Sequence, residues 1–250
     1  MSTEIRNKAG EKIDYTFHDV GSEKIIVIGH GVTGNKDRPL VLALAEGLSN
    51  AGISALRFSF SGNGDSEGSF MDSNITKEVS DLDAVITFVQ GLGKEVIYAG
   101  HSMGGAVGVS VASEDPRITA LISLAGMVNT KKFAITEFGE VTPDQGLMWD
   151  DEDCPLSQSF MDDLTGIDTL LEKGTLIKVP WLLVHGTEDD VVLIDDTQEI
   201  NEKAAENSSK LIIEGADHVF SDPEHMKTMV DGVIEWLSCC LLYTSPSPRD

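Results

Sequence analysis

The sequence has 250 residues, of which 42 are acidic and 18 basic, giving a formal net charge of −24 at pH 7. A chain this acidic repels the phosphates of nucleic acids and the anionic surface of membranes. We therefore expect neither as a partner. Its length suffices to bury a sizeable core, and α/β chains of this size commonly form one domain.

Cysteine usage and hydropathy narrow the class of protein further. Cys154, Cys239 and Cys240 form no spaced framework, which excludes a small disulfide-stabilised scaffold. The first residues contain no apolar signal segment, and no stretch approaches 18 uninterrupted apolar residues. We therefore expect a soluble, cytoplasmic protein.

The first two predicted elements are strands of different kinds. Residues 11–20 place Ile13, Tyr15 and Phe17 at period two, which is typical of a half-buried edge strand. Residues 24–28 form a continuous apolar run rich in β-branched side chains, as in a strand covered on both faces.

Helices and strands then alternate along the chain. The predicted helices cover 39–50, 75–90 and 103–113, and the strands that follow them cover 55–60, 95–99 and 118–125. Such alternation indicates βαβ crossovers, so the predicted fold class is α/β, with a mostly parallel central sheet flanked by helices.

From about residue 127 to 178 the regular pattern stops, and we interpret this acidic segment as an insertion above the site. The alternation resumes with strand 181–185, a helix near 193–206 and strand 210–213. A last helix opens with Asp222 and Pro223 and is expected to end near Ser238. Residues 239–250 follow no pattern, and we expect a non-native addition there, with a genuine flexible tail as the alternative.

The strand-to-helix junction at Gly100-His101-Ser102-Met103-Gly104 carries the main chemical signal. A tight turn between glycines two before and two after a serine exposes its hydroxyl above the sheet edge. Ser102 is therefore the candidate nucleophile. An incidental serine in a glycine-rich turn is the alternative, and the flanking strand and helix count against it.

A serine nucleophile needs a histidine base, which in turn needs a carboxylate. His218 and Asp189 each follow a predicted strand, at the sheet edge where ligands bind in open α/β sheets. We assign His218 as base and Asp189 as acid, with its neighbours Glu188 and Asp190 as alternative acids. The other histidines, His18, His30, His101, His185 and His225, are expected in packing, loop or surface roles.

An oxyanion formed at a carbonyl also needs two donors. The loop 30–34 (His-Gly-Val-Thr-Gly) can approach a substrate closely and supply one donor. The Met103 amide, at the start of the helix after the turn, can supply the other.

Residues 62–68 lack the lysine of a phosphate loop, so we expect a turn that lines the pocket. Residues 150–153 lack the spacing of a calcium loop and are expected to be a solvated acidic run. No cofactor or metal is required.

Four segments together, HGVTG, GHSMGG, HGTEDDVV and GADHVF, resemble the α/β-hydrolase fold superfamily over residues 10–238. Residues 30–36 and 57–68 are similar to bacterial cinnamoyl and feruloyl esterases, and GHSMGG is also similar to monoacylglycerol lipases. The resemblance implies one α/β-hydrolase domain, residues 1–238, with a lid insertion after the sixth strand. It also implies a catalytic triad of Ser102, Asp189 and His218, and an oxyanion hole made by the amides of Val32 and Met103.

We therefore expect a serine carboxylesterase that hydrolyses a small-molecule ester through an acyl-enzyme. Monoacylglycerol lipase, feruloyl esterase and amide hydrolase are the alternatives within the class, and a catalytically silent binding protein is the alternative outside it.

Residues 127–178 contain no tyrosine to hold a phenol and only scattered apolar side chains. Short acyl groups of about two to six carbons are thus expected to react best, because each buried methylene adds only about 0.8 kcal/mol. The acidic insertion is expected to disfavour anionic substrates. A homodimer is one possible oligomeric state for this chain.

Overall fold

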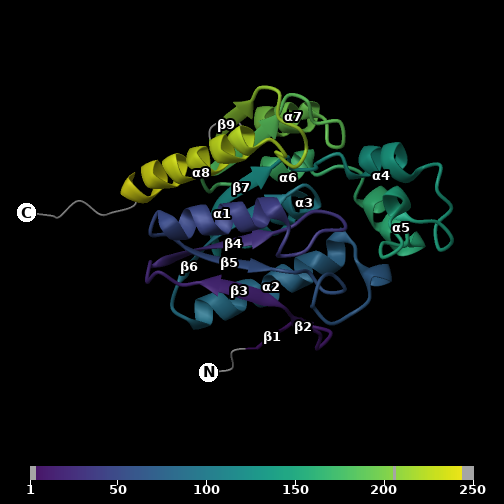
Figure 1. The fold of residues 1–250 in the computed structure, drawn as a ribbon, viewed down its shortest axis with the longest axis horizontal. Helices are drawn as coiled ribbons and strands as arrows, with labels where there is room; N and C mark the ends of the chain where they lie inside the picture. The colour runs from purple at the N-terminus through teal and green to yellow at the C-terminus, as the bar shows by residue number, and fades with distance from the viewer. Residues whose placement is uncertain (1–3, 205–206, 244–250) are drawn as a thin grey trace, which may run out of the picture.

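The computed structural model describes residues 4–204 and 207–243, which form a sheet covered by helices on both faces (Figure 1). The strands are β1 (Ile5–Arg6), β2 (Lys12–Ile13), β3 (Tyr15–His18), β4 (Lys24–Gly29), β5 (Ser54–Phe58), β6 (Glu95–His101), β7 (Ile118–Leu124), β8 (Trp181–Gly186) and β9 (Ser208–Ile213). The helices are α1 (Pro39–Asn50), α2 (Ile75–Gly91), α3 (Met103–Ala112), α4 (Thr130–Phe138), α5 (Gln158–Ile167), α6 (Leu171–Gly174), α7 (Ile194–Ala204) and α8 (Pro223–Tyr243), with short 3-10 turns η1 (Phe70–Asp72) and η2 (Met148–Asp150).

Seven strands form the central sheet in the order β3-β5-β4-β6-β7-β8-β9. Only β3 runs antiparallel to its neighbour, and the other pairs are parallel. The mostly parallel sheet predicted from the sequence is confirmed. Because the carboxyl ends of the parallel strands meet at one edge, the loops after β4, β6, β8 and β9 are brought together there.

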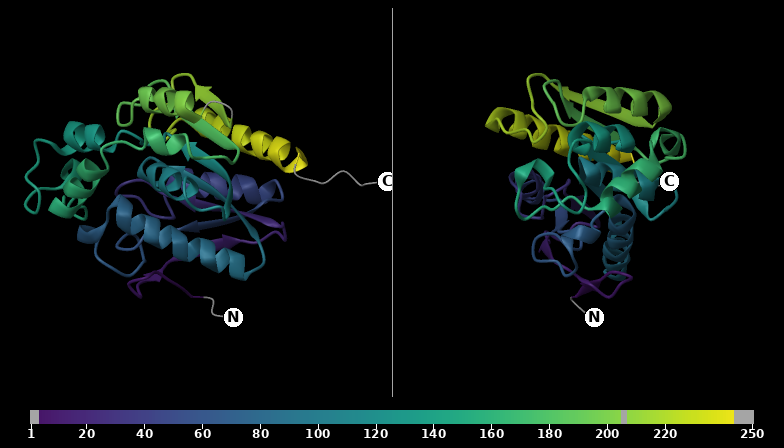
Figure 2. Two further views of the ribbon diagram at one scale, coloured as in Figure 1. Left: turned by 180° about the vertical axis from the view of Figure 1, so that it is seen from behind. Right: turned by 90° about the vertical axis from the view of Figure 1, so that its right-hand side faces the viewer.

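Two apolar cores cover the two faces of this sheet. Along β4, Ile25 and Val27 pack against the core that includes α2 and α3, whereas Ile26 and Ile28 pack against α1 and α8. Figure 1 shows α1 and α8 on the near face, and the view from behind in Figure 2 shows α2. The continuous apolar run of β4 follows from this double burial.

The segment predicted as strand 11–20 is split between two sheets. β2 pairs with β1 in a separate two-stranded sheet, while β3 joins the main sheet beside β5. Asp14 lies at the break, where its N–H donates to Ser66 Oγ and its carbonyl accepts from Ser59 N–H. These bonds to the loop after β5 replace ladder bonds, so the strand cannot continue through Asp14.

The insertion and the last helix also differ from the expectation. The insertion follows β7, which is the fifth strand of the main sheet in chain order rather than the sixth, and it contains α4, η2, α5 and α6. Helix α8 runs to Tyr243 instead of ending near Ser238. No glycine or proline occurs between Ser238 and Pro246, so the sequence contains no signal that ends the helix earlier. The rest of the predicted tail, 244–250, lies outside the described residues.

A buried polar network joins α2 to the N-terminal strands. Asp81 accepts hydrogen bonds from Asn7 Nδ2 at 2.7 Å, from Ser61 N–H at 2.8 Å and from Ser61 Oγ at 2.7 Å. One turn earlier, Glu78 accepts one bond from Ser73 Oγ at 3.1 Å, and its second carboxyl oxygen has no partner among the described residues. Burial, together with the nearby charge of Asp81, raises the pKa of Glu78 well above its usual value.

This raised pKa predicts a pH dependence of stability. In the unfolded chain Glu78 releases its proton near its ordinary pKa of 4.5, whereas the folded chain retains it to higher pH. The stability that protonated Glu78 contributes to the folded state is therefore complete below pH 4.5. It is lost as the pH rises toward the folded pKa, by up to about 1.4 kcal/mol of unfolding free energy per pH unit. Glu78→Gln should flatten the fall in the free energy of unfolding between pH 5 and pH 8, measured by urea denaturation. The exposed Glu140→Gln is the control, and parallel curves for wild type and Glu78→Gln would contradict the assignment.

Candidate active site

Ser102 lies in a strained turn between β6 and α3. Its backbone angles, φ 54° and ψ −118°, are ones that residues other than glycine rarely adopt, and such strain costs about 1–3 kcal/mol. The turn is held from both sides: Ser102 N–H donates to Leu124 O at 3.0 Å, and Ser102 O accepts from Gly105 N–H at 2.8 Å and Met127 N–H at 3.1 Å. The surrounding backbone therefore imposes the conformation.

Two glycines make this turn possible. A β-carbon on Gly100 would lie 2.2 Å from Gly104 O, and one on Gly104 would lie 2.5 Å from His30 O. Neither neighbour is a flexible side chain, so a side chain at either position would force the backbone apart. The spacing read in the sequence thus reflects the close packing of β6, α3 and the loop after β4.

His218 and Asp189 form an acid–base pair at the same edge of the sheet. Asp189 follows β8 and His218 follows β9, and their Oδ2 and Nδ1 atoms lie 2.8 Å apart. The other carboxyl oxygen of Asp189 accepts from the N–H groups of Val191 at 3.0 Å and Val192 at 2.9 Å. Because Nδ1–H donates to the carboxylate, Nε2 is left to accept a proton. Glu188 and Asp190, the alternative acids, are exposed.

Asp189 is ionised despite its burial. Burial opposes the charged form, but the hydrogen bonds from His185, His218 and the Val192 amide outweigh it and hold the pKa of Asp189 well below its usual range. The carboxylate can therefore fix the His218 tautomer and stabilise an imidazolium.

His185 is a positioning residue whose contact with the acid the sequence did not reveal. Its Nε2 lies 3.1 Å from Asp189 Oδ2 and 2.8 Å from Val192 O, and its Nδ1 lies 2.8 Å from Thr197 Oγ1. The side chain is fully buried. We expected a structural role from its place at a strand end, and the four-residue spacing to Asp189 is the signal that could have suggested more.

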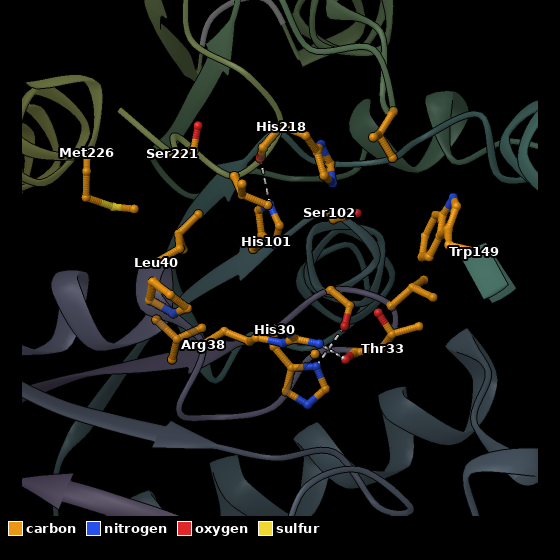
Figure 3. Close-up of a pocket in the computed structure, with 17 residues that line it drawn as sticks. His30, Thr33, Arg38, Leu40, His101, Ser102, Trp149, His218, Ser221 and Met226 are labelled. Carbon is orange, nitrogen blue, oxygen red and sulfur yellow. Dashed lines mark hydrogen bonds between the residues drawn. The ribbon is translucent and has the colours of Figure 1, made fainter. Parts of the chain in front are cut away.

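Ser102 and His218 line one cavity of about 650 Å³ (Figure 3). Figure 3 shows the His218 ring on the side of its backbone that faces Ser102, although no hydrogen bond joins the two side chains among the described contacts. Such bonds are often long in unliganded enzymes and tighten when substrate binds. The other residues around the cavity are His30, Gly31, Val32, Thr33, Gly34, Arg38, Pro39, Leu40, Val41, His101, Trp149, Val191, Val219, Ser221 and Met226.

His101 and His30 support the site through backbone bonds. His101 Nε2 lies 3.0 Å from His218 O, and burial, with the nearby His218, lowers the pKa of His101 to about 3. His30 Nδ1 donates to Gly31 O at 2.8 Å and its Nε2 accepts from Phe60 N–H at 3.0 Å, while burial lowers the pKa of His30 to about 4. The loop role predicted for His30 is confirmed, and both rings are neutral.

The two predicted oxyanion donors flank Ser102 along different segments. Val32 lies in the loop after β4 and lines the cavity, whereas Met103 is the buried first residue of α3 and its side chain does not. Neither amide donates a hydrogen bond within the described chain.

Several other predicted features lie away from the cavity. Residues 62–68 do not line it, because Gly62 N–H bonds Glu67 O and Glu67 N–H bonds Lys12 O, which fold the loop onto β2. The expected pocket role of this loop is wrong. Residues 150–153 are exposed and do not line the cavity either. His18, in β3, accepts a hydrogen bond from Arg57 Nε in β5, and His225 lies on α8.

Two kinds of feature are absent from the described residues. No group of three or more His, Cys, Asp or Glu side chains is arranged to hold a metal ion. No helix in the same residues is long and apolar enough to cross a membrane.

Comparison with known proteins places this geometry among related folds. The profile of a family described as serine aminopeptidase, S33, matches residues 21–144. An uncharacterized protein of Mycobacterium tuberculosis strain H37Rv is 25% identical over 225 residues, covering 87% of this chain and 71% of that protein.

Three solved structures share the fold. Est1E from Butyrivibrio proteoclasticus with ferulic acid bound has a TM-score of 0.83 at 24% identity, covering 96% of this chain and all of that one. The Pyrococcus furiosus esterase Pf2001 has a TM-score of 0.77 at 22% identity, with 96% and 90% covered. A monoacylglycerol lipase from Paleococcus ferrophilus has a TM-score of 0.75 at 20% identity, with 91% and 98% covered.

The geometry predicts which acid matters. Asp189→Asn should lower kcat by about 10³-fold or more, because an amide can hold His218 in the wrong tautomer. Glu188→Gln and Asp190→Asn should change kcat little, since both side chains are exposed. Steady-state hydrolysis of a 4-nitrophenyl ester by the three variants tests this, and a larger loss in either neighbour would move the acid role to it.

Proposed function

We propose that this chain, which shares the fold of solved esterases and lipases, is an α/β-hydrolase and a serine carboxylesterase that hydrolyses short-chain carboxylic esters through an acyl-enzyme. The observation that carries this proposal is the strained Ser102 in one cavity with the His218–Asp189 pair. A strained serine without a base, or a base without a serine, would support no such reaction.

Each group has a role in the proposed mechanism. Ser102 Oγ attacks the ester carbonyl while His218 Nε2 accepts its proton, and Asp189 stabilises the resulting imidazolium. The amides of Val32 and Met103 donate to the oxyanion, and loss of one such donor typically lowers the rate by about 10²–10³-fold. His218 then protonates the leaving alkoxide. Water, deprotonated by the same imidazole, releases the acid and restores Ser102.

The walls of the cavity support a short acyl group. Trp149, contributed by the insertion, packs against Phe138 with ring centroids 4.9 Å apart and donates from Nε1 to Glu137 at 2.8 Å, which hold it in place. On the α1 side the wall includes the charged Arg38. A long alkyl chain gains from continuous apolar contact, and a guanidinium in the wall interrupts it. We propose that the insertion acts as a lid whose contribution at the site is Trp149.

The similar proteins also support three alternative activities: feruloyl esterase, monoacylglycerol lipase and amide hydrolase. Est1E binds ferulic acid and the Paleococcus neighbour is a monoacylglycerol lipase, while the matching family profile is described as a serine aminopeptidase. A feruloyl ester, a monoacylglycerol and an amide matched to the best ester therefore belong in the substrate panel.

Ser102→Ala tests the nucleophile. The change removes one oxygen and keeps a β-carbon in the same turn, so the thermal unfolding curve should be unchanged while kcat falls by about 10⁴-fold or more. Wild type, and not the variant, should be labelled by a serine-directed fluorophosphonate. Normal turnover by the variant would refute the assignment, and absence of labelling in active wild type would do the same.

Acyl preference tests the pocket. The specificity constant for 4-nitrophenyl esters from acetate to palmitate should be highest between about two and six carbons, since further methylenes, each worth about 0.8 kcal/mol when buried, find no continuous apolar wall. Trp149→Ala should extend the tolerated length. An optimum at about ten carbons or beyond would favour the lipase alternative.

A further inference from the structure

The charge of the cavity wall is opposite to that of the molecule. The chain carries 42 acidic side chains, yet none of the residues lining the cavity is Asp or Glu. Arg38 is the lining residue with a permanent charge, because His30 and His101 are held neutral by burial. The acidic run 150–153, expected to repel anions, is exposed and lines no part of the cavity.

The Arg38 guanidinium uses only part of its hydrogen-bonding capacity among the described residues. Its Nη2 donates to Thr33 O at 2.7 Å, and the described residues show no ion pair for it. The adjacent acid, Asp37, does not neutralise it, because that carboxylate pairs with Lys36 at 2.7 Å and with Arg57. A guanidinium has five N–H donors in a planar fork that matches a carboxylate. Most of that fork is available to a ligand.

The position of Arg38 connects this charge to the reacting centre. Its partner Thr33 is the residue after Val32, so the guanidinium borders the loop that carries an oxyanion donor. Figure 3 shows Arg38 and Thr33 on the side of the cavity opposite His218. The first turn of α1 follows directly, with no acidic residue and no side-chain cap, which adds positive potential at the same wall.

Distant acids do not cancel this attraction. At physiological ionic strength the screening length is about 8 Å, so exposed carboxylates elsewhere act weakly on a ligand inside the cavity. Arg38 is itself exposed where it borders the cavity, so its charge is partly screened, and the planar geometry of its fork has to contribute to binding as well as the charge.

We propose, on the basis of the esterase function above, that the preferred substrates are esters bearing a carboxylate, and that Arg38 binds this carboxylate. A half-ester of a short dicarboxylic acid carries such a carboxylate, as does an ester whose alcohol part is the hydroxyl of a hydroxy acid. The two differ in whether the carboxylate is on the acyl or the alcohol side. Arg38 is a specificity-determining residue, and its bond to Thr33 also supports the oxyanion loop.

Two matched pairs of esters test the proposal, one with the carboxylate on the acyl part and one with it on the alcohol part. On the acyl side, the 4-nitrophenyl monoester of adipic acid is compared with 4-nitrophenyl hexanoate. On the alcohol side, 3-carboxyphenyl hexanoate is compared with phenyl hexanoate. The readout is the ratio of kcat/KM for the charged and neutral members of each pair, corrected for spontaneous hydrolysis. Comparing this ratio between variants cancels the intrinsic reactivity of the esters.

Arg38→Gln should lower this ratio by about tenfold in at least one pair, and the pair affected identifies the side. Arg38→Lys should retain part of it, since a lysine keeps the charge and loses the fork. Lys227→Gln is the matched control: it removes one positive charge beside the lining residue Met226 without facing the cavity, and should leave the ratio unchanged. An equal loss for charged and neutral esters in Arg38→Gln would show that Arg38 only holds the loop and would overturn the proposal. An equal effect of Lys227→Gln would overturn it too.

A binding measurement separates this proposal from the esterase function. Binding to Ser102→Ala can be measured without turnover, for monomethyl adipate against methyl hexanoate and for 3-carboxyphenyl hexanoate against phenyl hexanoate. In at least one of these pairs the charged ester should bind about tenfold more tightly by titration calorimetry, and Arg38→Gln in that background should remove the difference. If no ester is hydrolysed and Ser102 is not labelled, the proposed function fails while these dissociation constants still decide the role of Arg38. Equal affinities within both pairs would overturn the carboxylate proposal alone.

Discussion

The backbone conformation of Ser102 is the constraint on which the site depends. Its φ of 54° persists because Leu124, Gly105 and Met127 bind its N–H and carbonyl from β7, α3 and the loop beyond. Those partners are in place only when β6 and β7 pair in parallel and α3 packs against both. The strain of the turn is thus balanced by the pairing of the central strands, so the nucleophile is presented only by the folded sheet.

The histidines show how the fold leaves one base available. His30, His101 and His185 have both the right chemistry and the right sheet edge, but their ring nitrogens are engaged by Gly31 and Phe60, by His218 O, and by Thr197, Val192 and Asp189. His218 uses Nδ1 to contact the Asp189 carboxylate and lines the cavity, whereas His185, which contacts the same carboxylate, does not line it. The other three rings fix the loops that hold it.

Charge is distributed in two separate layers. The acidic side chains of 150–153 face solvent, where they are screened, and the cavity is lined by neutral histidines, apolar side chains and Arg38. The acidity of the whole chain therefore bears on partners such as nucleic acid and on solubility, and it does not describe the field met by a substrate. A small number of lining residues sets that field.

The sequence by itself determined the fold class and singled out the three residues of the proposed triad, because both depend on local signals. Period-two and continuous apolar runs mark strands, and the glycines around Ser102 are required by contacts of 2.2 and 2.5 Å that no side chain could enter. It could not determine the split at Asp14, the extent of α8, the contact between His185 and Asp189, or which charges face the cavity. Those depend on which residues distant in the chain become neighbours. The sequence suggested that the acidic insertion would repel anions, and only the packed structure showed that residues 150–153 are exposed away from the cavity and that Arg38 lines it, because the folding of distant segments decides which side chains face the site.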